Sequence, residues 1–549
     1  MPTSAELKFT SRRSPVYGLG GMVATSQPLA VAAGLEILSQ GGNAADAAVA
    51  TAAALNVTEP TSTGLGGDCF ALYYEASSGQ ISALNGSGRA PASLTIERLR
   101  KEGLEDNLPP LHPYTITVPG ACAGWCDLLA QHGRLPLTKV LTPAIRLAER
   151  GFPVAPITAY FWERSSERLR NALGGAELTI DGRTPRAGEI FHNHGLARTL
   201  RRVAEGGKAA FYQGELAEAI ASVVQKAGGC LNRDDLAAHT STWEQPISTT
   251  YRNLRVWECP PNGQGLAALL ALNLLEGFDI ASMPPLSVQR LHLMIEAMRL
   301  AFADTRWYVA DPAFSPAPLE WLLSKDYAVD RRKLIHPNHA TLDPSRGTPT
   351  SSSDTVYLSV VDAEGNACSF INSNYMGFGT CIVPFGWGFT LQNRGVGFSL
   401  DPCHPNALAP GKRPYHTIIP GMITVDSAGS SHLPNTLYAS FGVMGGFMQP
   451  QGHIQVVLGL LDDGLDPQAA LDQPRFCIDD GSSEGQVALE EGISREVQSD
   501  LDKMGHTTYS VSGQARVLFG RGQIVRRDAI TGVLCGGSDP RADGCAVSL

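Results

Sequence analysis

The stretch Thr350-Ser-Ser-Ser-Asp354-Thr355-Val-Tyr-Leu-Ser-Val-Val361 marks an abrupt change in the character of the chain. The residues that lead up to it, 335–354, are rich in Pro, Ser, Thr and Asn, which is typical of a surface loop or linker. Residues 355–361 are rich in β-branched and aromatic side chains and predict a strand. Residues 362–366 then predict a turn, and 367–372 the returning strand of a hairpin. A linker that opens directly onto a core strand fits a site where the backbone is cut and the new end stays buried.

The segments on either side of this hairpin predict both helices and antiparallel strands. Helices are expected over 27–58 with a break at Gly41-Gly42-Asn43, through most of 120–230, and over 291–308, 451–461 and 494–504. Strands are expected over 70–74 and 81–84 as a hairpin, and near 417–424 and 437–441. The chain therefore has an α+β organisation without a fixed-period repeat, and the linker divides it into residues 1–354 and 355–549.

Composition excludes several classes of protein. Hydrophobic residues make up 43% and charged residues 17% of the chain, so a substantial core can form. The net charge is −10 and no long Lys/Arg run occurs, which argues against nucleic acid or an anionic membrane as a partner. The longest apolar stretch, Ala47 to Val57, is too short to span a bilayer and predicts a buried helix. No apolar region follows the basic residues near the start, so we expect a cytoplasmic protein.

The cysteines and histidines show no metal-binding pattern. Eleven Cys occur without a CxxC pair, and an odd number in a chain of this kind indicates reduced thiols. Thirteen His are dispersed, without an HExxH motif. We therefore predict no metal and no other cofactor.

Thr355 is a candidate nucleophile. A Thr at the start of a chain carries a hydroxyl that can attack a carbonyl and an α-amine that can act as general base. The pKa of a free α-amine, about 7.7–8.0, suits that role near neutral pH. This unit exists only after the Asp354–Thr355 bond breaks, for which the route is attack of the Thr355 hydroxyl on the preceding carbonyl, an N-to-O acyl shift and ester hydrolysis. The alternative is a Thr that merely begins a strand after a Ser-rich loop.

Two further features could complete such a site. In Gly442-Val-Met-Gly-Gly446, the adjacent glycines Gly445 and Gly446 can point backbone N–H groups at a tetrahedral oxyanion, although the same residues also suit an ordinary tight turn. Hydroxyl and amide side chains on the return strand and beyond could orient the nucleophile. These are Ser373, Asn374, Asn393 and Thr417.

Over residues 17–545 the chain resembles the gamma-glutamyltransferase (glutathione hydrolase) family of N-terminal-nucleophile hydrolases. The resemblance rests on short motifs in the family's order and spacing. They are Gly41-Gly-Asn-Ala-Ala-Asp46, Thr63-Gly-Leu-Gly-Gly67, Val118-Pro-Gly120, Pro260-Pro-Asn-Gly-Gln-Gly265, Glu296-Ala-Met-Arg-Leu-Ala-Phe-Ala-Asp304, Asp354-Thr355, Lys412-Arg-Pro414, Gly445-Gly446, Pro474-Arg-Phe476 and Ser538-Asp-Pro-Arg541.

The resemblance implies a four-layer αββα sandwich in which two subunits share one core. It implies a zymogen that cuts itself between Asp354 and Thr355 into a large subunit, 1–354, and a small subunit, 355–549. Gly445 and Gly446 would form the oxyanion hole, and Ser373 would position the nucleophile. The expected partner is a small amide such as glutathione or a related amide that carries a carboxylate.

The sequence departs from the family where the substrate is bound. Ser87 stands where the family has an Arg that grips a carboxylate, and Arg89 follows two positions later. The segment Gln392 to Phe398 lacks the family's acidic pair, which holds an amino group, and contains Arg394 instead. A Ser pair of the family is replaced by His416-Thr417. The candidate substrate-binding residues are therefore Arg89, Asn374, Asn393, Arg394, His416 and Thr417.

Three functions remain open on this evidence. The first is hydrolysis or transfer of a γ-glutamyl group through an acyl-Thr355 intermediate. The second is hydrolysis of an acyl amide that has a carboxylate but no α-amino group, such as an oxamate or glutaryl amide. The third is an inactive family member that acts as a binding protein.

Overall fold

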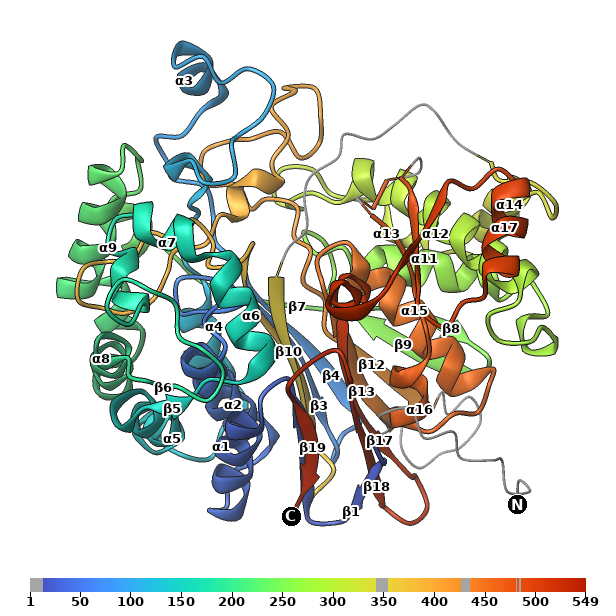
Figure 1. Ribbon diagram of the computed structural model, residues 1–549, viewed down its shortest axis with the longest axis horizontal. Coiled ribbons are helices and arrows are strands. Elements are labelled where there is room, and N and C mark those ends of the chain that lie inside the picture. The colour runs from blue at the N-terminus through green and yellow to red at the C-terminus, as the bar shows by residue number, and fades with distance from the viewer. Residues whose placement is uncertain (1–12, 342–353, 426–434, 480, 483–484) are drawn as a thin grey trace.

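A computed structural model of the chain describes residues 13–341, 354–425, 435–479, 481–482 and 485–549. Two seven-stranded antiparallel sheets lie at the centre, and helices cover the outer face of each (Figure 1). The fold is therefore α+β, a four-layer αββα sandwich, as the resemblance implies. Most of the predicted surface linker, 342–353, lies outside the described residues.

The strands of the two large sheets come from both ends of the chain. In spatial order, the first sheet contains β1 (Val16–Gly18), β18 (Leu534–Ser538), β17 (Arg521–Arg527), β13 (Thr436–Met444), β12 (Gly421–Val425), β9 (Leu254–Glu258) and β8 (Ile247–Tyr251). The second contains β19 (Cys545–Ser548), β2 (Gly21–Thr25), β10 (Asp354–Asp362), β11 (Ala367–Tyr375), β3 (Asp68–Glu75), β4 (Gln80–Gly86) and β7 (Thr242–Glu244). Both sheets thus combine strands from before and after residue 354, which is why the two parts share one core.

The two sheets meet through β10 and β13. Ser359 Oγ lies 2.8 Å from Ser440 Oγ across the interface. Two residues along each strand, Gly442 lies against the ring of Tyr357, where a Cβ atom would come within 2.5 Å of a ring carbon. Glycine at 442 therefore permits the close approach of the two sheets.

The outer helical layers pack on these sheets. The helices are α1 (Pro28–Ser39), α2 (Ala44–Thr58), α3 (Ile96–Lys101), α4 (Ala121–His132), α5 (Leu137–Arg150), α6 (Pro156–Arg164), α7 (Ser166–Asn171), α8 (His194–Tyr212), α9 (Gly214–Lys226), α10 (Arg233–Ala237), α11 (Gly265–Leu275), α12 (Val288–Tyr308), α13 (Leu319–Leu322), α14 (Lys325–Arg332), α15 (Met448–Leu461), α16 (Pro467–Asp472) and α17 (Arg495–Lys503). Helices α1 and α2 cover the second sheet, and α11, α12 and α15 cover the first (Figure 1). Two smaller sheets contain β5 (Phe152–Pro153) with β6 (Ile190–Phe191), and β14 (Phe476–Ile478), β15 (Val487–Glu490) and β16 (Thr508–Val511).

Helix α2 is buried along its whole length, as the Ala-rich sequence predicts. Its start is fixed by a capping box, in which the Asn43 side chain accepts from the backbone N–H of Asp46 and the Asp46 carboxylate accepts from that of Asn43. The break between α1 and α2 begins at Gly41, whose φ angle is positive, and ends at this cap. None of the helices in the described ranges is long and apolar enough to cross a membrane.

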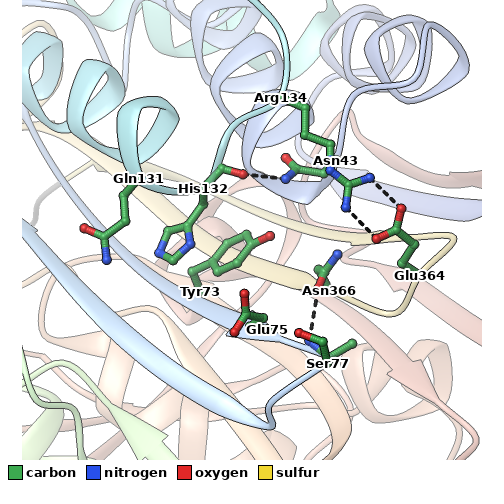
Figure 2. Close-up of a pocket in the computed structure, with 10 residues that line it drawn as sticks. Asn43, Tyr73, Glu75, Ser77, Gln131, His132, Arg134, Glu364 and Asn366 are labelled. Carbon is green, nitrogen blue, oxygen red and sulfur yellow. Dashed lines mark hydrogen bonds and ion pairs between the residues drawn. The ribbon is translucent and has the colours of Figure 1, made fainter.

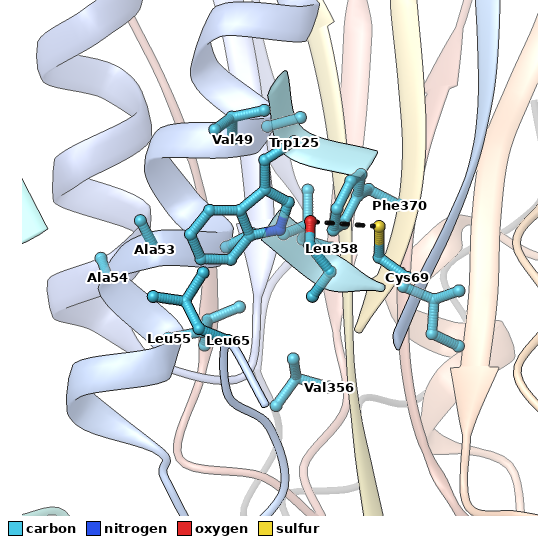
Figure 3. Close-up of a cluster of buried hydrophobic side chains, with 14 of the residues drawn as sticks. Val49, Ala53, Ala54, Leu55, Leu65, Cys69, Trp125, Val356, Leu358 and Phe370 are labelled. Carbon is cyan, nitrogen blue, oxygen red and sulfur yellow. Dashed lines mark hydrogen bonds between the residues drawn. The ribbon is translucent and has the colours of Figure 1, made fainter. Parts of the chain in front are cut away.

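A core beneath α2 anchors the start of β10. Figure 3 shows Trp125 of α4 among side chains of α2 and of the second sheet, including Val356 and Leu358. The Trp125 indole N–H donates to Asn372 Oδ1 at 3.1 Å. Since Val356 directly follows Thr355, this packing fixes the backbone that carries the candidate nucleophile.

The predicted elements are confirmed apart from their ends. Strand β11 continues to Tyr375, beyond its predicted end at residue 372, and β12 begins at Gly421, so Thr417 lies in a loop. Ser373 and Asn374 are consequently strand residues. Both differences concern candidate site residues.

Candidate active site

A β-bulge faces the candidate nucleophile. Thr355 is the second residue of β10 and is fully buried, and its two neighbours pair with Tyr375 and Asn372 of β11. Two residues of β11, Ser373 and Asn374, therefore stand opposite the single residue Thr355. Thr355 Oγ1 donates to Ser373 Oγ at 3.1 Å, and the backbone N–H of Tyr375 donates to the same oxygen at 2.8 Å. Since a bulge redirects side chains, it explains how Ser373 comes to contact the hydroxyl of Thr355.

Arg394 lies beside this pair. It begins a short 3₁₀ helix, Arg394–Gly397, and its Nη2 is 3.4 Å from Ser373 Oγ. Nη1 donates to Thr417 Oγ1 at 2.8 Å, and the guanidinium lies 4.3 Å from the centre of the Tyr375 ring. None of its contacts in the described part of the chain is with a carboxylate, and its Nε has no partner there. Burial lowers the pKa of Arg394 to about 10, so the side chain remains charged near neutral pH.

The glycine pair follows β13 and precedes α15. Gly445 and Gly446 have φ angles of +135° and +61°, which an L side chain rarely adopts. The contacts between β10 and β13 follow a regular register. Ser359 contacts Ser440, and two residues along each strand Tyr357 contacts Gly442. Continuing this register by two more residues along each strand places Thr355 opposite Met444, the residue before Gly445.

Gln264 connects the glycine pair to Arg394. Its Nε2 donates to the carbonyl of Thr417 at 2.7 Å and to that of Gly446 at 2.8 Å. A continuous set of contacts thus joins Thr355, Ser373, Arg394, Thr417, Gln264 and Gly446. Gln264 belongs to the motif Pro260-Pro-Asn-Gly-Gln-Gly265, and a Gln within this Gly-rich turn is the local signal for its role.

His416 is adjacent to this chain of contacts and is held neutral. Its Nε2 lies 3.0 Å from Asp68 Oδ2, and its Nδ1 accepts from the backbone N–H of Ile418 at 3.4 Å. Burial, with the charge of Arg394 nearby, lowers the pKa of His416 to about 3. Asp68 was not predicted from the sequence. Its other oxygen, Oδ1, accepts from Gln392 and from the backbone N–H groups of Gly88 and Gly120.

Three predicted residues are placed differently. Asn393 donates to the carbonyl of Pro110 and accepts from a backbone N–H, so its side chain supports the turn after β11. Asn374 lies opposite Thr355 but donates to Thr390, and its buried Oδ1 has no partner among the described residues. Arg89 donates to the carbonyl of Thr240, and none of its described hydrogen bonds reaches Thr355 or its neighbours. The structure therefore brings Arg394, His416 and Thr417 to the nucleophile, but not Arg89.

A surface hollow of about 410 Å³ lies away from these residues. Figure 2 shows it between Tyr73, His132, Arg134 and Glu364, near the turn that joins β10 to β11. Thr355 is at the opposite end of β10, which at 3.2–3.4 Å per residue is about 25 Å away. The hollow is therefore separate from the candidate active site.

Comparison with known proteins gives consistent matches. The family model for gamma-glutamyltranspeptidase matches residues 30–549. The glutathione hydrolase-like YwrD proenzyme of Bacillus subtilis is 38% identical, with 97% of this chain and 99% of that protein covered. The oxamate amidohydrolase proenzyme of Klebsiella pneumoniae is 32% identical, with 96% and 98% covered.

Among solved structures, cephalosporin acylase from Bacillus halodurans matches with a TM-score of 0.90 and 47% identity, over 100% of this chain and 99% of the other. The resemblance found in the sequence motifs is thereby confirmed at the level of both sequence and fold. The chain belongs to the gamma-glutamyltranspeptidase family.

Proposed function

We propose that this chain cuts itself before Thr355 and then hydrolyses a small amide whose acyl group carries a carboxylate. Residues 1–354 and 355–549 would be the two subunits. The observation that carries the proposal is the buried guanidinium of Arg394, which lies beside the nucleophile's partner Ser373 and has no carboxylate contact in the described part of the chain.

The first reaction is cleavage of the Asp354–Thr355 bond. Thr355 Oγ1 attacks the carbonyl carbon of Asp354, the C–N bond breaks, and the α-nitrogen of Thr355 takes up the proton lost by the hydroxyl. Water then hydrolyses the resulting ester, which leaves a carboxylate on Asp354 and a free hydroxyl and amine on Thr355. The intact chain buries Thr355 completely, so cleavage is also what would give substrate access to it.

The second reaction uses the same hydroxyl on the substrate. The α-amine of Thr355 accepts the hydroxyl proton as the oxygen attacks the amide carbonyl, and it returns a proton to the departing amine. The backbone N–H groups of the Gly445-Gly446 turn would stabilise the oxyanion. Water then hydrolyses the acyl-Thr355 ester and releases the carboxylic acid.

The position of Arg394 favours a short acyl group. Ser373 Oγ is 3.1 Å from Thr355 Oγ1 and 3.4 Å from Arg394 Nη2, so the guanidinium lies within about 6–7 Å of the nucleophile. A substrate carboxylate bound to Arg394 is therefore only a few bonds from the carbonyl that Thr355 attacks. This geometry suits monoamides of short dicarboxylic acids, a class that includes oxamate and glutaryl amides.

The described contacts around Arg394 and Ser373 include no free acceptor for a substrate ammonium group. Asp68, the nearest acid in the network, already accepts from His416, Gln392 and two backbone N–H groups. This favours an acyl group without an α-amino group. The second candidate, γ-glutamyl hydrolysis, is favoured by the family itself and by the glutathione hydrolase-like relative.

Three p-nitroanilides that differ by one group each separate these candidates. The glutaryl amide lacks only the α-amino group of the γ-glutamyl amide, and the butyryl amide additionally lacks the carboxylate. We expect kcat/KM to be highest for the glutaryl compound and lowest for the butyryl compound, with oxamate as a further substrate. A higher kcat/KM for the γ-glutamyl compound would favour the second candidate, and equal values for all three would remove Arg394 from substrate binding.

Cleavage is tested separately by gel electrophoresis of the purified protein. Wild type should give two chains that meet at residues 354 and 355, and Thr355→Ala should remain one chain. A wild-type protein that stays uncut after prolonged incubation would overturn the proposed mechanism and support a binding protein.

A further inference from the structure

A buried cluster of metal-ligating side chains lies outside the active site. His292 and Glu296 are one turn apart on α12, and His506 follows α17, which packs against α12 (Figure 1). All three side chains are buried, and one nitrogen or oxygen from each lies within 4.8 Å of those of the other two. Nothing in the proposed amide hydrolysis uses these residues.

The hydrogen-bond roles in this cluster can be assigned from a backbone carbonyl. His292 Nε2 is 2.7 Å from the carbonyl oxygen of His336, which can only accept, so Nε2 carries the hydrogen and Nδ1 carries a lone pair. His292 Nδ1 is 2.8 Å from His506 Nε2, which must therefore be the donor between them. It follows that the neutral ring of His506 has its lone pair on Nδ1 in the metal-free protein, and that an ion bound by both rings would have to displace the hydrogen between His292 Nδ1 and His506 Nε2.

Two buried acceptors in the cluster then have no donor. Neither His506 Nδ1 nor Glu296 Oε1 has a hydrogen-bond donor among the described residues, and the cation nearest to Glu296 Oε1, Arg299 Nε, lies 3.9 Å away. A buried acceptor that lacks a partner costs about 1–3 kcal/mol. The cluster is thus rich in lone pairs and poor in hydrogens, which is the opposite of what a closed hydrogen-bond network requires.

We propose that His292, Glu296 and His506 bind one zinc ion. Two imidazoles and a carboxylate are a typical zinc ligand set, with water as the fourth ligand. His292 also donates its other N–H to a carbonyl, the arrangement that fixes the tautomer and orientation of a metal-bound histidine. Glu296 is held in place because its Oε2 accepts from the backbone N–H of Thr341 at 2.8 Å.

One cationic side chain already lies beside the cluster. Arg299 Nε is 3.9 Å from Glu296 Oε1, but the same guanidinium also donates to the carbonyl of Gly485 at 3.0 Å. The ion would replace this distant contact with a direct bond to the carboxylate. The proposal departs from the absence of a metal expected from the sequence, because only the tertiary fold brings His506 to α12.

The ion would stabilise the contacts that hold the segment before the proposed cleavage position against α12. His336 and Thr341, which contact two of the ligands, belong to the last described residues before the stretch that leads to Thr355. This consequence rests on the proposed function, whereas the metal site itself does not. Measuring metal binding in both wild type and the uncut Thr355→Ala variant keeps the two apart.

The test is zinc binding by untagged protein that has been stripped with a chelator and then dialysed. We expect about one zinc per chain by elemental analysis, and an affinity, measured by competition with a chromophoric chelator, that falls about 100-fold or more in His506→Gln and in Glu296→Gln. Cobalt substitution should give the strong visible absorption of a tetrahedral site. The matched control is His194→Gln, which alters one of an exposed pair of stacked histidines elsewhere on the molecule and should not change binding.

Two results would overturn the proposal. One is a wild-type protein that binds well below one zinc per chain, since the cluster would then be completed by water or an extra proton. The other is binding that is lost in His339→Gln but kept in His506→Gln, which would place the ion at the exposed His336–His339 pair. The unfolding temperature of each stripped variant shows whether it has folded, and Glu296→Gln preserves side-chain volume if His506→Gln does not fold.

Discussion

Replacing Arg394 with Met should separate function from stability. If Arg394 exists to bind a substrate carboxylate, the free protein carries a buried charge whose counter-ion arrives only with the substrate. Removing that charge should then cost little stability while abolishing the contact that selects the substrate.

The magnitude follows from the surroundings of the guanidinium. Burial lowers the pKa of Arg394 to about 10, and this shift corresponds to about 3 kcal/mol against the charged form. The hydrogen bond to Thr417 returns about 1 kcal/mol, and the contact with the Tyr375 ring about 1–2 kcal/mol. These contributions nearly cancel, so Arg394→Met should leave the unfolding temperature unchanged or slightly higher.

The chain offers a matched control. Arg475 is equally buried, but its guanidinium lies 2.9 Å from the Asp539 carboxylate. Breaking such a buried pair typically costs about 3–5 kcal/mol, so Arg475→Met should lower the unfolding temperature clearly. Activity should show the reverse order, with a loss of about 100-fold or more in kcat/KM for the glutaryl amide in Arg394→Met. A large loss of stability in Arg394→Met with unchanged kcat/KM would refute the reasoning, because Arg394 would then be a structural residue.

Three further substitutions test the surrounding network. Ser373→Ala removes the acceptor of the nucleophile's hydroxyl bond and should lower kcat by about 10- to 100-fold with little change in KM, measured on the glutaryl amide. Gln264→Leu breaks the link between the carbonyls of Thr417 and Gly446 and should lower kcat by about 100-fold; an unchanged kcat would exclude a role in placing the glycine turn. His416 has a pKa of about 3 when folded but about 6.5 when unfolded, so the unfolded chain binds a proton between these values and the folded chain does not. The stability that wild type owes to neutral His416 is therefore complete above pH 6.5 and lost as pH falls, by about 2 kcal/mol at pH 5. The unfolding temperature of wild type relative to His416→Gln should fall between pH 7.5 and pH 5, and a constant difference would contradict this assignment.

The elements of the fold were predictable where a pattern lies within one segment. The capped break at Gly41 to Asn43, the hairpin around residues 362–366 and the glycine pair at 445–446 all depend on neighbours within a few residues. The bulge of β11 was not predictable, because only its pairing with β10 reveals that two residues face Thr355. The predicted end of this strand at residue 372 was therefore too early.

The site residues divide in the same way. Thr355 and the glycine pair could be proposed from their own sequence, since a Thr after a Ser-rich linker and adjacent glycines carry local signals. Asp68 and Gln264 contact His416 and Thr417 from positions more than 150 residues away, so no local pattern could assign them. Arg89 illustrates the converse, because its local sequence suggested a substrate-binding residue, whereas its side chain donates to the carbonyl of Thr240.

The residues at which this chain departs from its family, 87, 394 and 416, can be explained together. Ser87 stands in place of the family's arginine, and its carbonyl accepts from the buried guanidinium of Arg413. Under the proposed function, the charge for a substrate carboxylate comes instead from Arg394, which lies beside Ser373. A charged Arg394 is best placed beside an uncharged neighbour, and His416 meets this condition because burial and the charge of Arg394 lower its pKa to about 3, although the Asp68 carboxylate, which accepts from Nε2–H, acts in the opposite direction. The residues at 87, 394 and 416 are therefore best understood as a single relocation of the carboxylate-binding charge, and restoring one of them alone should not restore the family's usual preference.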